Sequence, residues 1–132
     1  MIEFNAKHRF AKITARKARL VADLVRGQPV NRALVLLDRS DKRAAVLVKG
    51  VVRSAVANAE QKTGGSVDLN DLYVSTARVD EGPLLGGHMR WRPAARGRAM
   101  PYRKRTAHIH ISLAARSAAA EAAPAAAAEK ED

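Results

Sequence analysis

Cysteine is absent from this chain of 132 residues. Its absence excludes disulfide frameworks, thiolate metal sites and cysteine nucleophiles, and it fits a reducing compartment. Aromatic residues are scarce at 4%, so the core must be built from Val, Leu, Ile and Ala, within a hydrophobic fraction of 47%. A chain of this length is expected to form one domain around such a core.

Long apolar runs are also missing. None approaches the ~20 residues needed to cross a bilayer. The first ten residues, MIEFNAKHRF, alternate polar and apolar positions and lack the apolar centre of a signal peptide. No glycine-rich phosphate loop and no recognisable grouping of a nucleophile with His and an acid occurs. We therefore expect a cytoplasmic protein that is not an enzyme, with no cofactor, no small-molecule substrate and no membrane partner.

Acidic residues are few outside the end of the chain. The net charge is +11, but the segment from Ser117 onward holds one Lys and four acids. Residues 1–116 therefore hold 23 basic and nine acidic residues, a net charge of +14. Such an excess repels itself and attracts polyanions, which makes nucleic acid the leading partner class. An acidic membrane surface fits less well, because no helix pairs a basic face with bulky apolar residues.

Helical periods fill the middle of the chain. Thr14 is placed to cap a helix that ends at Arg26 before Gly27, and Pro29 suits the first turn of a second, short helix. Ser40 or Asp41 is expected to cap a third helix that ends at the Gly64–Gly65 pair. The predicted buried stripes are Ala18, Val21, Ala22 and Val25; Val30, Ala33, Leu34 and Leu37; and Ala44, Leu47, Val48, Val51, Ala55 and Ala59.

Strand periods lie on either side of the helices. Segment 2–10 alternates, with Ile2, Phe4, Ala6 and Phe10 expected on its inner side, and segments 71–79 and 105–113 also read as strands. This order predicts an α+β domain with helices packed on one face of a small antiparallel sheet. The Ala-rich, acidic segment 114–132 is of low complexity and is expected to be disordered.

The segment between the last two strands resists burial. Residues 88–105, HMRWRPAARGRAMPYRKR, hold seven Arg or Lys and no acid. If both strands continue into one hairpin that turns near His88–Pro93, each arm reaches roughly 30–40 Å, beyond a domain whose radius of gyration is about 14 Å. A projecting two-stranded ribbon is marginal in water. We expect a polyanion to order it, with Arg on phosphate and Trp91 and Tyr102 stacked on bases; a flexible basic loop is the alternative.

Two clusters of basic residues lie at the starts of predicted helices. Arg16, Lys17 and Arg19 lie in the first turns of the first helix, and Lys42 and Arg43 lie at the start of the third. Positive charge there opposes the helix dipole. It becomes favourable when a phosphate occupies the helix N-terminus. Solvated charged faces are the alternative, but two such coincidences favour nucleic acid.

Other candidate chemistry is weak. His108 and His110 alternate on a strand and share a face, but a metal site would need a third ligand, so we expect no metal and assign both to RNA or water. Asp80 and Glu81 are neighbours on a strand and point to opposite faces. We expect them to pair with nearby arginines rather than to act as an acid and a base.

Four segments carry a resemblance to a known family. ITARKARLVADLVRG (13–27), SAVANAE (54–60), ARVDEGP (77–83) and ARGRAMPYRKRTAHIHI (95–111) together resemble bacterial ribosomal large-subunit protein twenty-two, with family order and spacing from Lys12 to Leu113. The resemblance implies three helices packed on a small three-stranded antiparallel sheet with a long protruding β-hairpin. It implies one RNA-binding domain, 1–113, whose hairpin, 79–106, enters the wall of the polypeptide exit tunnel.

The resemblance also implies partners and site residues. The partners would be large-subunit (23S) rRNA, bound early in assembly, neighbouring large-subunit proteins, and the nascent polypeptide at the hairpin tip. Where relatives have a basic pair after Gly-Pro, this chain has Gly86–Gly87, which predicts an unusual tip formed by His88, Met89, Arg90 and Trp91. The predicted RNA-binding residues are Arg16, Lys17, Arg19, Lys42, Arg43, Arg90, Arg92, Arg96, Arg98, Arg103, Lys104, Arg105 and His108.

A DNA-bending architectural protein with a basic β-arm is the rival from another class. Such proteins are also small and basic, and they dimerise to place two arms in the minor groove. This sequence shows no large apolar surface for a dimer, so we expect no homo-oligomer. Co-sedimentation with the large ribosomal subunit separates the two hypotheses.

Overall fold

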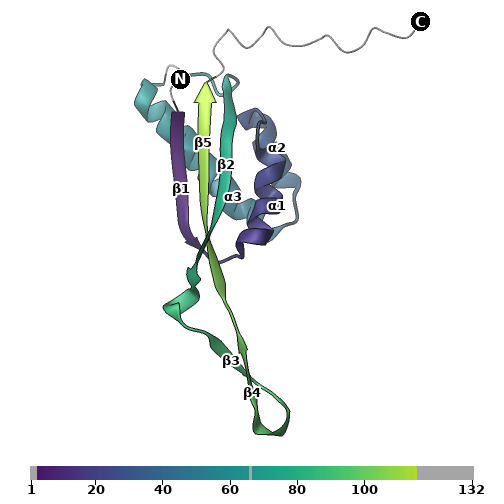
Figure 1. Ribbon diagram of the computed structural model, residues 1–132. Coiled ribbons are helices and arrows are strands. Elements are labelled where there is room, and N and C mark those ends of the chain that lie inside the picture. The colour runs from purple at the N-terminus through teal and green to yellow at the C-terminus, as the bar shows by residue number, and fades with distance from the viewer. Residues whose placement is uncertain (1–2, 66, 116–132) are drawn as a thin grey trace, which may run out of the picture.

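The computed structural model describes residues 3–65 and 67–115. Three helices precede most of the sheet, and a ribbon leaves the body between its last two strands (Figure 1). The helices are α1 (Ala15–Val25), α2 (Val30–Arg39) and α3 (Arg43–Thr63). The strands are β1 (Glu3–Ala11), β2 (Leu72–Leu84), β3 (Arg90–Pro93), β4 (Ala99–Tyr102) and β5 (Arg105–Ala115), with single 3₁₀ turns η1 (Leu85–Gly87) and η2 (Ala95–Gly97).

The body is an α+β domain, as the alternating and helical periods predict. Its sheet has the order β1-β5-β2, and both pairs are antiparallel. All three helices lie on one face of this sheet, where α3 packs on β1 and β5 while α1 packs on β2 (Figure 1). The other face carries no element within the described ranges. The expected three helices on a three-stranded antiparallel sheet with a hairpin are confirmed.

Helix packing follows the predicted stripes. The four predicted stripe residues of α1 are buried, as are Val30, Ala33 and Leu37 of α2, while Leu34 and Leu47 pack at the edge of the core. The start of α3 differs from expectation. Ser40 ends α2, with its N–H on the Leu37 carbonyl, so the chain stays extended until Lys42, the actual N-cap. The expected stop is confirmed, since Gly64 closes α3 in the left-handed conformation at φ 63°.

The alternation of β1 breaks before its end. Phe4 and Ala6 are buried as expected, but Phe10 is 50% exposed and Ala11 takes the next core position. Pairing shifts between His8 and Ala11, because two residues on β1 (Arg9 and Phe10) face one residue on β5 (His108). This bulge turns Phe10 outward at φ 55°. The expectation that Phe10 faces the core is therefore wrong.

The last two body strands are longer than their sequence patterns indicate. β2 continues to Leu84, and β5 continues to Ala115 rather than ending at Leu113. Ala114 and Ala115 thus belong to the sheet and not to the expected Ala-rich tail. The remainder of that segment, 116–132, lies outside the described residues.

The hairpin turn lies further out than His88–Pro93. β3 pairs with β4 from Arg90–Tyr102 to Pro93–Ala99, and the turn is closed by the Ala94 N–H on the Arg98 carbonyl at 2.7 Å. Gly97, at φ 68°, supplies the left-handed conformation that this turn needs. The hairpin therefore turns at 94–98, and the prediction that 88–93 forms its end is wrong.

The Gly86–Gly87 pair makes a bend instead of a tip. The Leu85 N–H donates to the Lys104 carbonyl at 2.7 Å, and the next paired position is Arg90 with Tyr102. Between these two positions, four residues on the outgoing arm of the hairpin (86–89) face a single residue, Arg103, on its returning arm. η1 absorbs this excess, because both glycines adopt positive φ, 79° and 77°.

Two glycines predict opposite effects of an added methyl group. At Gly82 a Cβ would lie 2.5 Å from Thr106 Oγ1 and 3.2 Å from the Thr106 carbonyl, at the base of the hairpin. Gly82→Ala should therefore lower the free energy of unfolding by about 1–3 kcal/mol. At Gly50, inside α3, a Cβ would meet nothing within 4 Å, so Gly50→Ala should raise it by about 0.5–1 kcal/mol. Urea unfolding measures both, and effects of the same sign would contradict this account.

Candidate nucleic-acid interface

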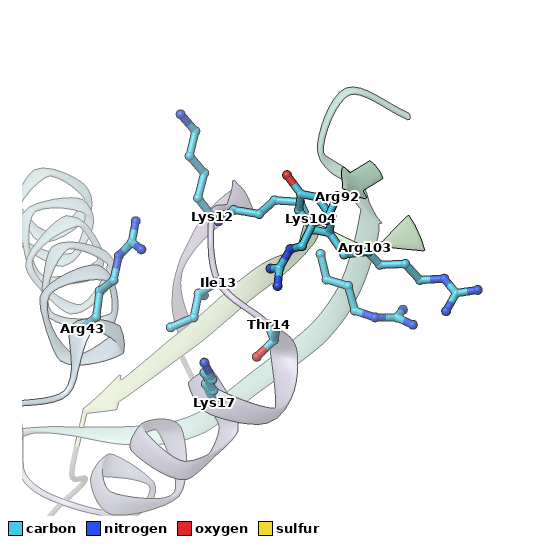
Figure 2. A pocket seen from close by; sticks show the side chains of 10 residues that line it. Lys12, Ile13, Thr14, Lys17, Arg43, Arg92, Arg103 and Lys104 are labelled. Atoms are coloured by element: carbon cyan, nitrogen blue, oxygen red, sulfur yellow. The ribbon is translucent and has the colours of Figure 1, made fainter. Parts of the chain in front are cut away.

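A cleft of about 340 Å³ lies where the hairpin leaves the body (Figure 2). Arg43 reaches toward it from α3, and the hairpin residues lie across from Arg43 in Figure 2. The strand-to-helix connection at 12–14 lies between them. The lining residues are Lys12, Ile13, Thr14, Lys17, Arg43, Arg92, Tyr102, Arg103, Lys104 and Arg105.

Seven of the ten lining residues are cations, and no acid is among them. The ion pairs of residues 3–65 and 67–115 join Arg26 to Asp23, Lys49 to Asp38, and Arg78 to Asp80, whose carboxylate also lies close to the His110 ring. None of these pairs involves a cation of the cleft. Like charges held together without counter-charges raise the local potential and favour an anionic ligand.

The starts of two helices meet this cleft. Thr14 is the N-cap residue of α1, Arg43 is the first residue of α3, and neither helix has an acid in its first turn. Neither N-cap side chain forms a capping hydrogen bond, which differs from the expected role of Thr14. The first N–H groups of a helix lack partners within the helix and carry partial positive charge. An anion bound at either helix start would therefore meet backbone donors as well as side-chain cations.

The two predicted helix clusters divide on folding. Lys17 and Arg43 line the cleft, whereas the exposed Arg16 does not. The Nε of Arg19 donates to the Val79 carbonyl at 3.2 Å, which ties α1 to β2. Lys42 is the N-cap residue next to Arg43. Lys12 is a lining residue that the sequence analysis missed; its signal is a basic residue two positions before a helix cap.

The outer ribbon has two chemically different faces. Opposite residues of an antiparallel pair share a face, and the faces alternate along each strand. Arg90 with Tyr102 and Arg92 with Met100 therefore form a cationic face, on which the Arg92 guanidinium lies 4.5 Å from the Tyr102 ring centre. The other face is uncharged and is formed by Trp91, Pro93, Ala99 and Pro101.

The predicted tip residues are not at the tip. His88 and Met89 belong to the bend after Gly87, where His88 Nδ1 lies 2.9 Å from the Gly86 carbonyl oxygen. Arg90 and Trp91 are strand residues of β3. Arg96 and Arg98 lie in the actual turn, with Arg96 at φ 58°. The bend near the glycines takes up the extra length that the sequence analysis placed at the tip.

The two strand histidines are engaged within the body. His108 Nδ1 accepts the Phe10 N–H at 3.0 Å, and the two rings meet edge to face with centres 4.9 Å apart. His108 therefore holds the β1 bulge, and its predicted contact with RNA stays a prediction. His110 Nε2 lies 3.4 Å from Asp80 Oδ2, and Arg78 Nε lies 3.3 Å from the same oxygen. The expected pairing of Asp80 with an arginine is confirmed.

Comparison with protein families places these features in a known group. Residues 6–114 match the family model described as ribosomal protein L22p/L17e. The matched span contains the cleft, both helix starts and the whole hairpin. Among the described helices, none is both long and apolar enough to span a membrane.

Proposed function

The chain belongs to the ribosomal protein L22p/L17e family, and on that premise we propose that its cationic cleft and hairpin are the surfaces that bind ribosomal RNA. Members of this family are structural, ribosome-bound proteins of the large subunit that bind its RNA. The sequence-based expectation of such a protein is confirmed at this level. The contacting residues, the role in assembly and the course of the hairpin are proposals.

One observation supports the RNA-binding surface most strongly. Cations from three distant parts of the chain, 12–17, 43 and 92–105, converge on one cleft that holds no acid. The fold brings these like charges together and provides no acidic partner for them in the cleft. A polyanion is therefore the ligand best suited to neutralise them. Arginine is suited to bidentate contact with phosphate. Lys17 and Arg43 would bind a phosphate together with the helix N-termini, and Arg103, Lys104 and Arg105 would follow the backbone along the returning arm.

Early assembly follows from how unequally the two parts are stabilised. The buried core residues all lie outside 86–103, whereas the β3–β4 pair has four residues in each strand and none of them is buried. A short ribbon of this kind is marginal alone. We therefore propose that the body binds RNA first and that RNA folding around the hairpin then orders the ribbon. A protein needed for that step must be present early.

The two faces of the outer ribbon fit a position in the wall of the exit tunnel. The cationic face, with Arg90, Arg92 and Tyr102, would lie on rRNA phosphates and bases. The opposite face exposes Trp91 at 61% and carries no charge, so it would meet the nascent polypeptide. The turn at 94–98, rather than 88–91, would reach furthest along the wall. Neighbouring large-subunit proteins would contact other parts of the body surface.

Shortening the ribbon tests this placement. Replacing 86–103 by Asn-Gly would close the hairpin directly between Leu85 and Lys104, which already share a backbone hydrogen bond. We expect the free energy of unfolding of the shortened protein to lie within about 1 kcal/mol of the parent's, because no core residue is removed. In reconstituted large subunits, chemical probing should show lost protection of tunnel-wall nucleotides, while the variant still sediments with the subunit.

A length-preserving control separates the ribbon's reach from its chemistry. Trp91→Ser with Pro93→Ser alters the uncharged face and keeps every arginine. Its tunnel-wall protections should match those of the parent. Unchanged protections in the shortened variant would place the ribbon elsewhere. A pool that stays off the large subunit in a sucrose gradient would contradict the RNA-binding proposal itself.

A further inference from the structure

The sheet face opposite the helices carries an ordered set of polar groups. In the pairing register, Lys7 on β1, His110 on β5 and Arg78 on β2 form one row straight across the sheet. Asn5, Ser112 and Thr76 form the neighbouring row. A groove of about 250 Å³ runs over both rows and is lined by side chains from all three strands.

The groups in this groove are mainly hydrogen-bond donors. Lys7 and Arg78 are permanent cations, and the second row supplies an amide and two hydroxyl groups that can donate or accept. Asp80 is the acid in contact with them, and its carboxylate is shared by Arg78 and His110. Lys7 has no acidic partner among the described residues. The groove therefore has a net positive charge.

The pKa of His110, at the centre of the groove, is affected by the same positive charges. Partial burial and the nearby Arg78 guanidinium lower the pKa of His110, with smaller contributions from Lys7 and His108, while Asp80 acts in the opposite direction. The imidazole thus stays neutral among cations near neutral pH. An anion seated in the groove would oppose this effect and raise the pKa.

We propose that this open sheet face is a second ribosomal RNA contact, in which a phosphate lies on the row Lys7–His110–Arg78 and the adjoining ribose or base meets Asn5, Ser112 and Thr76. The inference rests on the proposed RNA-binding function and adds a site on the face away from the helices. Adjacent strands lie ≈ 4.8 Å apart. Three side chains in a row across the sheet therefore place their donors within reach of one phosphate group and the phosphates next to it. The uncharged row supplies groups of the kind that contact sugars and base edges.

The same composition argues against a protein partner for this face. Protein interfaces use buried aromatic and aliphatic anchors at their centre and exclude charge there. In this groove the apolar lining residues, Ala6 and Ile111, are buried in the core and offer only backbone to it. The exposed groups are charged or polar and sit at the centre of the surface. Such a surface complements a phosphate backbone.

A pair of substitutions measures the contact directly. Lys7→Gln with Arg78→Gln keeps side-chain length and removes both charges. We expect the slope of log affinity against log salt, for full-length large-subunit rRNA transcribed in vitro, to flatten by about 1.5–2. The matched control is Arg32→Gln with Arg39→Gln, two exposed cations of α2 that line neither the cleft nor the groove. The control should leave the slope nearly unchanged.

A gain of affinity provides a second arm that misfolding cannot imitate. Asp80→Asn removes the acid beside the groove, so affinity should rise about twofold to fivefold at low salt. An unchanged slope for the Lys7–Arg78 pair, or an unchanged affinity for Asp80→Asn, would overturn this second contact. Substitutions in the cleft distinguish failure of the second contact from failure of the proposed function. If the cleft variants also leave RNA binding unchanged, the proposed RNA-binding function fails as well. Lost incorporation into subunits with normal RNA affinity would assign the face to a protein neighbour instead.

Discussion

Replacing Arg103, Lys104 and Arg105 together by alanine should lower the affinity for large-subunit rRNA by about 10- to 100-fold near physiological salt. The three side chains lie on the returning arm and line the cleft beside the starts of α1 and α3. Each phosphate contact releases condensed counterions, so the slope of log affinity against log salt should flatten by about 2–3. Filter binding or fluorescence anisotropy over a salt series measures both quantities.

Loss of structure does not account for the expected effect. The contribution of Lys104 to the hairpin is its backbone carbonyl, which accepts the Leu85 N–H, and Arg105 pairs with Leu84 through backbone register. Alanine retains these backbone groups. All three side chains are exposed or line the open cleft, so the free energy of unfolding should change by about 0.5 kcal/mol or less at each site.

A matched triple substitution tests whether position matters as well as charge. Arg32, Arg39 and Lys62 are exposed on α2 and the end of α3 and do not line the cleft. Their replacement by alanine removes the same net charge and should produce a much smaller change of slope. Equal slopes for the two triples would reduce the interaction to net charge alone and contradict a defined interface on the arm.

The sequence predicts the body well because its signals are local. A helical stripe such as Val21 and Val25 depends on residues one turn apart, and a glycine such as Gly64 ends a helix by its own conformational freedom. Cationic clusters are visible in the same way, since like charges lie close together along the chain. These features specify the fold class and the class of partner without any knowledge of long-range contacts.

The cleft itself depends on contacts that sequence periods do not encode. Lys12 and Arg43 are 31 positions apart, and their convergence requires the packing of α3 on β1. The fate of Arg19 is similar, because its bond to the Val79 carbonyl exists only when α1 lies on β2. Spacing along the chain identifies cations near helix starts. It does not separate those that face a ligand from those that tie elements together.

The sequence pattern predicts the wrong position for the hairpin tip for a related reason. Glycines favour positive φ wherever the chain must bend, so a Gly-Gly pair fits a bulge on one arm as well as a terminal turn. Which of these forms depends on the register between arms, here set by the bonds from Leu85 to Lys104 and from Arg90 to Tyr102. That register is a cross-strand property. It moves the outermost residues from His88–Trp91 to the turn at 94–98.

The two phenylalanines of β1 should differ sharply on truncation. Phe4 is 1% exposed at the centre of the core, and Phe4→Ala should lower the free energy of unfolding by about 3–5 kcal/mol, since it leaves a cavity in an interior otherwise built of Val, Leu, Ile and Ala. Small domains have only about 5–15 kcal/mol in all. Urea unfolding monitored by circular dichroism measures the loss, which should also appear as poor accumulation of the free protein.

Phe10→Ala is the matched control on the same strand. Its ring is 50% exposed and contacts His108 at its edge, while the hydrogen bond to His108 comes from the backbone and survives substitution. We expect a change of about 1 kcal/mol or less. Because alternation alone predicts that both rings face the core, the difference between the variants measures the bulge between His8 and Ala11.

The outcome also bears on the cleft. Shifting a strand by one residue exchanges the sides of all its later side chains, so the bulge that turns Phe10 outward also puts Ala11 in the core and sets how the chain enters Lys12 and Thr14. If Phe10→Ala costs as much as Phe4→Ala, β1 follows plain alternation, and the placement of Lys12 beside Lys17 is wrong. If Phe10→Ala is nearly neutral, the bulge is part of how the body builds its cationic cleft, and adding RNA should stabilise Phe4→Ala in proportion to its binding.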